Sequence, residues 1–258
     1  MTATDNFAIY PSLRDRVIVV SGGATGIGEA IVEAFAQQQA RVVFLDIQDA
    51  AAEALIARLK SSGCAPPAYY HCDLTDVAAL QHTMQAILAR FPAVDVLVNN
   101  AANDARHKIE EVTSDFWDHS MAENLKHQFF LAQAVIPSMK TSGRGSIINM
   151  SSISWTVPLT GIPVYVTAKA AIVGMTRALA HELGSSNIRV NCVMPGAILT
   201  EKQKRLWLTE AYTAEVLASQ ALQRMLLPDE VARLVLFLAA DDSSAITNQS
   251  YVIDGGWT

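Results

Sequence analysis

Short apolar runs, often β-branched, alternate along the chain with longer stretches whose apolar residues recur every three or four positions. Runs such as VIVV, VVFL and VLV are almost uninterrupted, which is typical of strands buried on both faces of a parallel sheet. We predict strands over Arg16–Ser21, Arg41–Asp46, Ala68–Cys72, Val94–Asn99, Ser146–Met150, Arg189–Val193 and Ser250–Ile253. We predict helices over Ile27–Gln38, Ala50–Ser61, Val77–Arg90, Ser114–Thr141, Val164–Leu183 and Asp229–Ala240.

Strand and helix alternation predicts the fold class, α/β, with a doubly wound parallel sheet of about seven strands and helices on both faces. No Pro/Gly-rich linker, low-complexity segment or repeat interrupts the pattern, so residues 1–258 are predicted to form a single domain. The segment Leu199–Gln220 has a helical composition, but no strand follows it before the next helix. We predict that residues 199–222 form a small helical lid over a ligand. The alternative is a surface hairpin without a role.

Composition narrows the class of protein. Of the 258 residues, 51% are hydrophobic and 17% charged, which supplies a core covered on both faces and excludes long disordered segments. The net charge of −6 argues against a nucleic-acid partner. Cys64, Cys72 and Cys192 have no metal-ligand spacing, so we expect no metal site and a reducing, cytoplasmic location. We also expect neither a signal peptide nor a membrane span.

A glycine-rich loop, SGGATGIGEAI, joins the first predicted strand to the first helix. Gly22, Gly26 and Gly28 there allow a tight turn, a close backbone approach to a phosphate, and free N–H groups aimed at an anion. The loop is therefore predicted to bind the phosphates of a dinucleotide. A plain strand-to-helix turn is the alternative.

The second strand ends at Asp46, where a carboxylate can accept hydrogen bonds from the adenine-ribose hydroxyls and would repel a 2′-phosphate. Neither Ile47 nor Thr25 offers a cation for that phosphate, so NAD is favoured over NADP. Asp73, at the end of the third strand, is placed to meet the adenine edge. Helix capping is the alternative for Asp46, and capping by Asp73 or Thr75 competes at the third strand.

The most specific pattern lies in SSISWTVPLTGIPVYVTAKAA. Tyr165 and Lys169 are four residues apart and share one face of a helix, and Ser152 precedes the tyrosine at the end of the fifth strand. A phenol has an ordinary pKa of about 10, so a nearby ammonium that favours phenolate would make it a usable base.

Together these motifs make the chain resemble a short-chain dehydrogenase/reductase of the roughly 250-residue type, from about Leu13 to Trp257. The resemblance implies a Rossmann-like sheet, a dinucleotide-binding and catalytic domain, and an active-site tetrad at Asn124, Ser152, Tyr165 and Lys169. It also implies that the cofactor-binding residues are Gly22, Thr25, Gly26, Ile27, Gly28, Asp46, Ile47, Asp73, Leu74, Asn100, Ala101, Ala102, Tyr165, Lys169, Pro195, Gly196, Ile198 and Thr200.

The resemblance further implies the role of each tetrad member. Tyr165 takes the proton of the substrate hydroxyl while hydride passes to the nicotinamide, and Ser152 orients that hydroxyl. Asn124 holds a water that connects Lys169 to solvent, and Lys169 also binds the nicotinamide ribose. Ala102 departs from the family's N-N-A-G motif, and its methyl group should fit only where the backbone φ is negative.

Within the family, the chain looks closest to bacterial aldose 1-dehydrogenases, which oxidise the C1 hydroxyl of a pentose or hexose to the lactone. The stretches that carry this likeness are YPSLR, FLDI, ND-x-RHK at Asn103–Lys108, SISW at Ser152–Trp155, LFLA-x-DD and IDGGW. Sugars need many hydrogen-bond partners and an apolar face. We therefore predict substrate contacts from Asn103, Asp104, Ser152, Ser154, Trp155, Tyr165, Gln203 and Trp207.

Several alternatives stay open at this point. Arg106 and His107 are expected in a salt-bridged surface turn rather than on the sugar, Trp155 can serve only in packing, and Trp207 can cover an interface. Two other functions compete with the aldose 1-dehydrogenase prediction. One is a polyol or secondary-alcohol dehydrogenase or ketoreductase, and the other is a nucleotide-sensing protein without catalytic activity. The predicted helices Ser114–Thr141 and Val164–Leu183 carry apolar residues around much of their circumference, more than one sheet face should bury. We therefore predict a homotetramer, with a dimer as the alternative.

Overall fold

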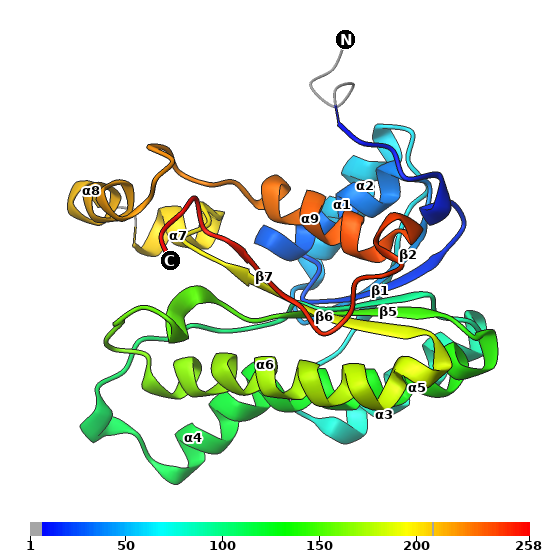
Figure 1. Ribbon diagram of the computed structural model, residues 1–258, viewed down its shortest axis with the longest axis horizontal. Helices are drawn as coiled ribbons and strands as arrows, with labels where there is room; N and C mark the ends of the chain where they lie inside the picture. The colour runs from blue at the N-terminus through cyan, green and yellow to red at the C-terminus, as the bar shows by residue number, and fades with distance from the viewer. Residues whose placement is uncertain (1–6, 208) are drawn as a thin grey trace.

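The computed structural model describes residues 7–207 and 209–258, and a seven-stranded parallel sheet lies at its centre (Figure 1). The spatial order of the strands is β3-β2-β1-β4-β5-β6-β7. Their bounds are β1 Val17–Ser21, β2 Arg41–Asp46, β3 Ala68–His71, β4 Val96–Asn99, β5 Gly145–Met150, β6 Ile188–Pro195 and β7 Ser250–Ile253. The predicted α/β fold class and the doubly wound sheet are confirmed.

Helices cover both faces of this sheet. Figure 1 places α1, α2 and α9 above it, and α3, α4, α5 and α6 below it. The bounds are α1 Gly26–Gln37, α2 Asp49–Ser61, α3 Val77–Arg90, α4 Ser114–Met121, α5 His127–Ser142, α6 Pro163–Leu183 and α9 Pro228–Ala239. No helix in the described ranges is both long and apolar enough to span a membrane.

The strands supply both cores because alternate side chains point to opposite faces. In β1, Ile18 and Val20 belong to the cluster under α1 and α9, whereas Val17 and Val19 belong to the cluster under α3 and α5. All five residues of β1 are buried, as its uninterrupted apolar run predicts.

The predicted helix Ser114–Thr141 is wrong as a single element. The structure divides it into α4, a π-helical segment Ala122–Lys126, and α5. The wider turn of a π-helix changes which side chains face inward, and such segments often occur at functional sites. Other element ends differ from prediction by a few residues; β4 begins at Val96 rather than Val94, and β6 extends to Pro195.

Two short helices follow β6 where the lid was predicted, α7 at Glu201–Leu206 and α8 at Glu210–Ser219. Figure 1 shows both helices beyond one end of the sheet, near the C-terminus of the chain. This end carries the carboxyl termini of the strands, because β6 runs directly toward α7.

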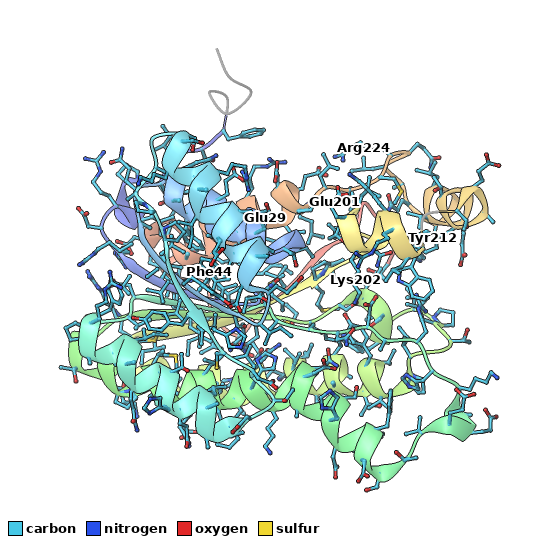
Figure 2. The ribbon with its side chains drawn as sticks, turned by 180° about the vertical axis from the view of Figure 1, so that it is seen from behind. Glu29, Phe44, Glu201, Lys202, Tyr212 and Arg224 are labelled. Carbon is cyan, nitrogen blue, oxygen red and sulfur yellow. The ribbon has the colours of Figure 1, made fainter. Side chains whose placement is uncertain are left out.

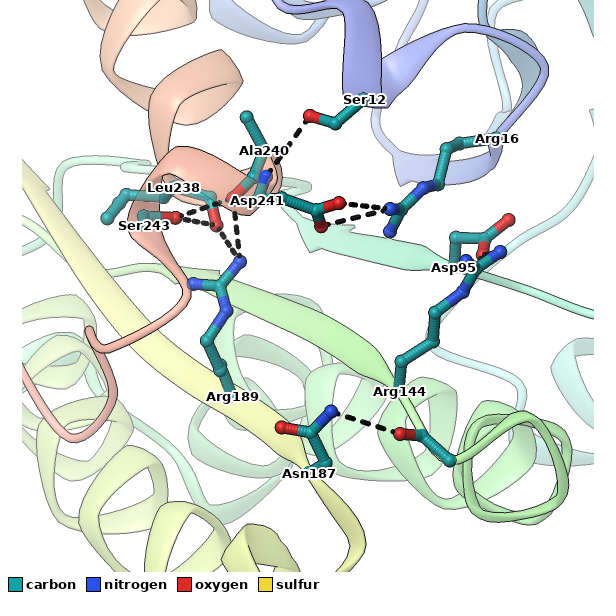
Figure 3. A network of polar contacts seen from close by, with 11 residues as sticks. Ser12, Arg16, Asp95, Arg144, Asn187, Arg189, Leu238, Ala240, Asp241 and Ser243 are labelled. Carbon is teal, nitrogen blue, oxygen red and sulfur yellow. Dashed lines mark hydrogen bonds and ion pairs between the residues drawn. The ribbon is translucent and has the colours of Figure 1, made fainter.

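Ion pairs and hydrogen bonds tie the elements together at the opposite, amino end of the strands (Figure 3). Arg16, just before β1, pairs with Asp241 at 2.8 Å, and Arg144, just before β5, pairs with Asp95 at 2.9 Å. Arg189 donates to the Leu238 carbonyl at 2.7 Å. These contacts leave the carboxyl end free for a ligand site.

The order of the strands also fixes where that site lies. In the sheet, β1 lies between β2 and β4. The connection after β1 leads to β2 on one side, and the connection after β3 leads to β4 on the other side. Connections that diverge in this way open a crevice at the carboxyl ends of the strands, where ligands bind in folds of this kind.

Candidate active site

A cavity of about 760 Å³ occupies this crevice. All the residues predicted to bind the cofactor line it, from the glycine loop at one end to Tyr165 and Lys169 at the other. The structure thus brings together residues from the ends of six strands, β1 to β6, and from α1, α6 and α7. Their binding roles stay predictions.

The glycine loop is closely packed against the chain that follows β4. Gly22 and Gly26 have φ values of +66° and +62°, which favour glycine. A Cβ at Gly28 would overlap the Gly22 carbonyl oxygen. Asn100 Nδ2 donates to that same oxygen at 2.9 Å and to the Ser21 carbonyl at 3.2 Å. The loop is therefore held in place while α1 begins directly behind it at Gly26.

Asp46 is buried at the end of β2, and its carboxylate is held by backbone donors. Oδ2 accepts from Ala24 N at 2.9 Å, and Oδ1 accepts from Ile47 N at 2.8 Å and Gln48 N at 3.0 Å. It does not cap a helix, because the N-cap of α2 is Gln48. Ile47 is 60% exposed beside it and offers an apolar surface at the cavity wall.

Asp73 lines the cavity and does not cap α3. Its Oδ1 accepts from Thr75 N at 2.9 Å and Thr75 Oγ1 at 2.7 Å, and these bonds lower the pKa of the carboxyl. The cap is Asp76, which accepts from Ala78 N and Ala79 N. The capping alternative for Asp73 or Thr75 is therefore wrong.

Tyr165 and Lys169 lie one turn apart on α6, with the Lys169 ammonium 5.3 Å from the centre of the Tyr165 ring. Lys169 is buried and its Nζ donates to the Met150 carbonyl at 2.9 Å. Ser152, which N-caps the turn after β5, accepts from Ser154 N and lines the same part of the cavity. Helical spacing on α6 and the end of β5 thus bring three members of the tetrad to one place.

The charges around Tyr165 are not all favourable to a phenolate. Burial of the phenol and the nearby Asp104 carboxylate raise the pKa of Tyr165, while Ser152 and Arg106 act in the opposite direction. Burial lowers the pKa of Lys169 to about 8. A further positive charge beside the phenol would lower this pKa and favour the phenolate.

Asn124, the fourth member of the predicted tetrad, lies inside the π-helical segment and is fully buried. Its Oδ1 accepts from Asn103 N at 2.9 Å, and its Nδ2 donates to the Ser120 carbonyl at 2.9 Å. The side chain thus links the break in the helix to the loop after β4. It lies behind the cavity wall, which Asn103 forms.

His127 is a site residue that sequence reasoning missed. It is fully buried, and Nε2 lies 3.1 Å from the Ala101 carbonyl oxygen. A carbonyl only accepts, so Nε2 carries the hydrogen. Burial, with Lys169 nearby, lowers the pKa of His127 to about 4, so the ring is neutral. The bond fixes the turn at Ala101, and Ala102 next to it has no positive φ, as predicted for a tolerated methyl group.

The structure divides the predicted substrate residues into two groups. Asn103, Asp104, Ser152, Tyr165 and Gln203 line the cavity. Three others lie outside its lining, namely Ser154, Trp155 and Trp207. Trp155 is 38% exposed on a short 3-10 helix.

Eight buried side-chain polar atoms in the described residues have no hydrogen-bond partner, and they are spread through the fold. Three of them belong to predicted substrate residues, namely Ser154 Oγ, Gln203 Oε1 and Trp207 Nε1, and of these three residues only Gln203 lines the cavity. Such atoms are costly in a folded protein unless a water or a ligand satisfies them.

The expected salt-bridged turn at Arg106 and His107 is wrong. Arg106 lies over the Trp207 ring, 5.1 Å from its centre, and donates to the Thr160 carbonyl. His107 packs against Phe116 with the ring centres 4.7 Å apart. Stacking and packing thus replace the ion pair, because Trp207, at the end of α7, places its ring beside the Arg106 guanidinium.

Other lining residues were also missed by sequence reasoning: Gln48, Cys72, Thr75, Glu123, Met150, Ser151, Glu201, Lys202 and Arg205. The residues from α7 follow directly on Thr200, whose Oγ1 caps that helix by accepting from Gln203 N. That capping threonine is a signal in the sequence that could have placed the first turn of α7 at the cavity.

Comparison with known proteins gives similarity along nearly the whole chain. A family model described as enoyl-(acyl carrier protein) reductase matches residues 22–258. The D-xylose 1-dehydrogenase of Caulobacter vibrioides (strain NA1000 / CB15N) is 48% identical over 97% of this chain and 98% of that protein. A protein of Rhizobium meliloti (strain 1021) named probable galactose dehydrogenase is 47% identical over 96% of both chains. A solved Serratia marcescens short-chain dehydrogenase/reductase mutant superposes with a TM-score of 0.87 at 33% identity, covering 95% of this chain and 99% of its own.

Proposed function

The chain belongs to the short-chain dehydrogenase/reductase family, and we propose that it is an NAD-dependent aldose 1-dehydrogenase. In this proposal it oxidises the C1 hydroxyl of a cyclic pentose or hexose to the lactone. The observation that carries the proposal is the near-full-length similarity to two proteins named for oxidation of aldoses. The grouping of Ser152, Tyr165 and Lys169 at one cavity supports it.

Enzymes of this family use nicotinamide cofactors, and the residues of the cavity fit one. The glycine loop that begins at Gly22 leads into the first turn of α1, which starts at Gly26, and the N-terminus of a helix suits a pyrophosphate. Asp46 would hold the adenine ribose, and Tyr165 and Lys169 stand at the other end for the nicotinamide ribose. When bound, the cofactor supplies a hydride acceptor and a positive charge near the phenol.

The protein's own residues then handle the proton and the orientation of the sugar. Tyr165 takes the proton of the C1 hydroxyl, and Ser152 holds that oxygen in place. Lys169, charged below a pKa of about 8, stabilises the phenolate, with its Nζ 5.3 Å from the centre of the Tyr165 ring. Asn124 stays in the π-helical segment and supports the proton path from Lys169 toward solvent.

The proposed sugar-binding residues are the predicted set, and Gln203 has the most direct support among the residues with an unpartnered atom. Gln203 lines the cavity, and its buried Oε1 has no hydrogen-bond partner, so it can accept from a sugar hydroxyl. Such a bond would relieve the cost of that buried atom. Ser154, Trp155 and Trp207 lie outside the lining, and their contact with the sugar stays a prediction.

A substrate panel tests the function directly. The purified protein is incubated with NAD and with pentoses, hexoses, polyols and secondary alcohols, and reduced cofactor is followed by its absorbance. We expect turnover with one or more aldoses and identification of the corresponding lactone as product. Turnover confined to polyols or ketones would contradict the aldose assignment while leaving the dehydrogenase intact.

We further propose a homotetramer located in the cytoplasm. An apolar groove of about 390 Å³ lies on the outer faces of α4, α5 and α6, and it is lined by Met121, Leu125, Lys126, Phe129, Phe130, Ala171 and Met175. Phe129 is 45% exposed there, a surface that a second copy would cover. Light scattering should give four times the 27.9 kDa chain mass. A monomeric mass would contradict the proposal.

A further inference from the structure

A lysine of the predicted lid crosses from α7 to the chain segment that follows β4. We propose that Lys202 is a positioning residue: it holds α7 against this segment and neutralises the carboxylate of Asp104, which lines the same cavity as Tyr165. The inference rests on the proposed function, because it takes Tyr165 as the base. It adds a residue that neither the family motifs nor the substrate predictions contain.

The geometry of the contact is well defined. Lys202 Nζ lies 2.6 Å from Asp104 Oδ1 and 3.2 Å from Asn103 Oδ1, across a sequence separation of nearly one hundred residues. The Asp104 side chain is 23% exposed and that of Lys202 is 44% exposed. In Figure 2, Lys202 lies on the side of α7 that faces the layer of helices below the sheet. The ion pair therefore connects α7 to the segment after β4 at the wall of the cavity.

Asn103 connects the ion pair to the proton path. Its side-chain oxygen accepts from Lys202, and its Nδ2 donates to both oxygens of Glu123, at 3.2 and 3.3 Å. Its backbone N donates to Asn124 Oδ1 at 2.9 Å. A movement of α7 at Lys202 would thus be transmitted to the residue that supports the water next to Lys169.

Asp104 matters to Tyr165 because both line the reactive end of the cavity. A negative charge there favours the neutral phenol, and Asp104 does raise the pKa of Tyr165. Oxidation of an alcohol requires the phenolate, so an uncompensated Asp104 would oppose the reaction. An ammonium 2.6 Å from the carboxylate offsets much of its field, although partial exposure of the pair reduces the effect.

Other titratable or charged groups surround the reactive end of the cavity and belong to each element packed against it. They are Arg106 after β4, Glu123 in the π-helical segment, His127 on α5, Lys169 on α6, Cys192 on β6, Glu201 and Arg205 on α7, and Tyr212 on α8. None of these is altered when only Lys202 or Asp104 is substituted. A shift of the pH profile in such variants therefore measures the ion pair.

The chain offers a matched control two residues away. Lys204 lies on the same short helix, is exposed to a similar degree at 45%, and pairs with Glu201 at 2.6 Å. It is outside the lining of the cavity. Its partner Glu201 does line the cavity, so Lys204→Met removes the same charge from α7 and leaves a lining carboxylate unpaired, without touching Asp104.

The experiment compares the pH dependence of kcat/KM for the alcohol that the panel identifies, at low ionic strength and saturating cofactor. For Lys202→Met we expect the acidic limb to move to higher pH by about 0.5 to 1 unit. At pH values below the limb, kcat/KM should therefore fall about three- to tenfold, and above the limb it should match that of the unaltered protein. In Lys202→Arg and Lys204→Met, the acidic limb should stay at the pH of the unaltered protein. In the double variant Lys202→Met/Asp104→Asn, the limb should lie at the same pH or at a lower one. The phenolate absorbance of the cofactor complex, with Tyr165→Phe as reference, should show the same shift.

Two results would overturn the proposal. The first is a Lys202→Met limb that does not move, even if KM rises, because the contact would then be only mechanical. The second is a moved limb that removal of the Asp104 charge does not restore. Failure of the aldose assignment is seen separately in the substrate panel, since the pH profile uses whichever alcohol is oxidised.

Discussion

Replacement of Tyr165 by phenylalanine should reduce kcat by about three orders of magnitude or more, within the range that general acid–base catalysis contributes. The phenol is the group at the reactive end of the cavity that can accept the substrate proton, since Lys169 Nζ is engaged with the Met150 carbonyl. The ring itself is retained, and so is the Lys169 ammonium 5.3 Å from its centre. Cofactor affinity and thermal stability should therefore change little.

Single-turnover and steady-state assays with the preferred aldose measure this loss, and a fluorescence titration measures cofactor binding. Tyr251→Phe serves as the matched control, because Tyr251 is a partly buried tyrosine of β7 outside the cavity. It should keep nearly full activity. A Tyr165→Phe protein that retains more than a tenth of the activity would exclude the phenol as the base.

The fold was predictable from the sequence because the strands are uninterrupted apolar runs, which indicate burial on both faces of a sheet. A run such as VIVV is apolar at every position, and all of β1 is buried on both faces. The break in the helix over Ser114–Thr141 was not predictable. The π-helical segment, AENLK, contains no glycine or proline that would mark a break, although Asn124 owes its place at the site to this segment.

The candidate site divides in a similar way. Gly22, Asp46 and Tyr165 occupy positions that follow from local spacing, at strand ends or on one helix face. His127 and Lys202 do not, because each acts through a partner distant in sequence, Ala101 in one case and Asp104 in the other. A single histidine or lysine in a helical stretch carries no local signal of such a contact. The substrate end is therefore the part that sequence reasoning describes least well.

The cofactor preference should reverse when the end of β2 is redesigned by Asp46→Ala together with Ile47→Arg. Asp46 would accept the ribose hydroxyls of NAD and repel a 2′-phosphate, and Ile47 is 60% exposed at the same wall of the cavity. The double substitution removes charge-assisted hydrogen bonds to NAD and supplies a guanidinium to NADP, each worth about 1.5–3 kcal/mol. The ratio of kcat/KM for NAD to that for NADP should fall by about a thousandfold.

Asp46→Ala alone separates the two contributions to that ratio. Its carboxylate also accepts from the backbone of Ala24, Ile47 and Gln48, so the single variant should lose NAD affinity and some stability before it gains NADP. The matched control is Asp49→Ala, whose carboxylate lies outside the cavity lining and bonds to Tyr69 at 2.6 Å. It should keep the NAD preference. A double variant that still prefers NAD more than tenfold would show that discrimination lies elsewhere than at Asp46, because its carboxylate and its repulsion would both be gone.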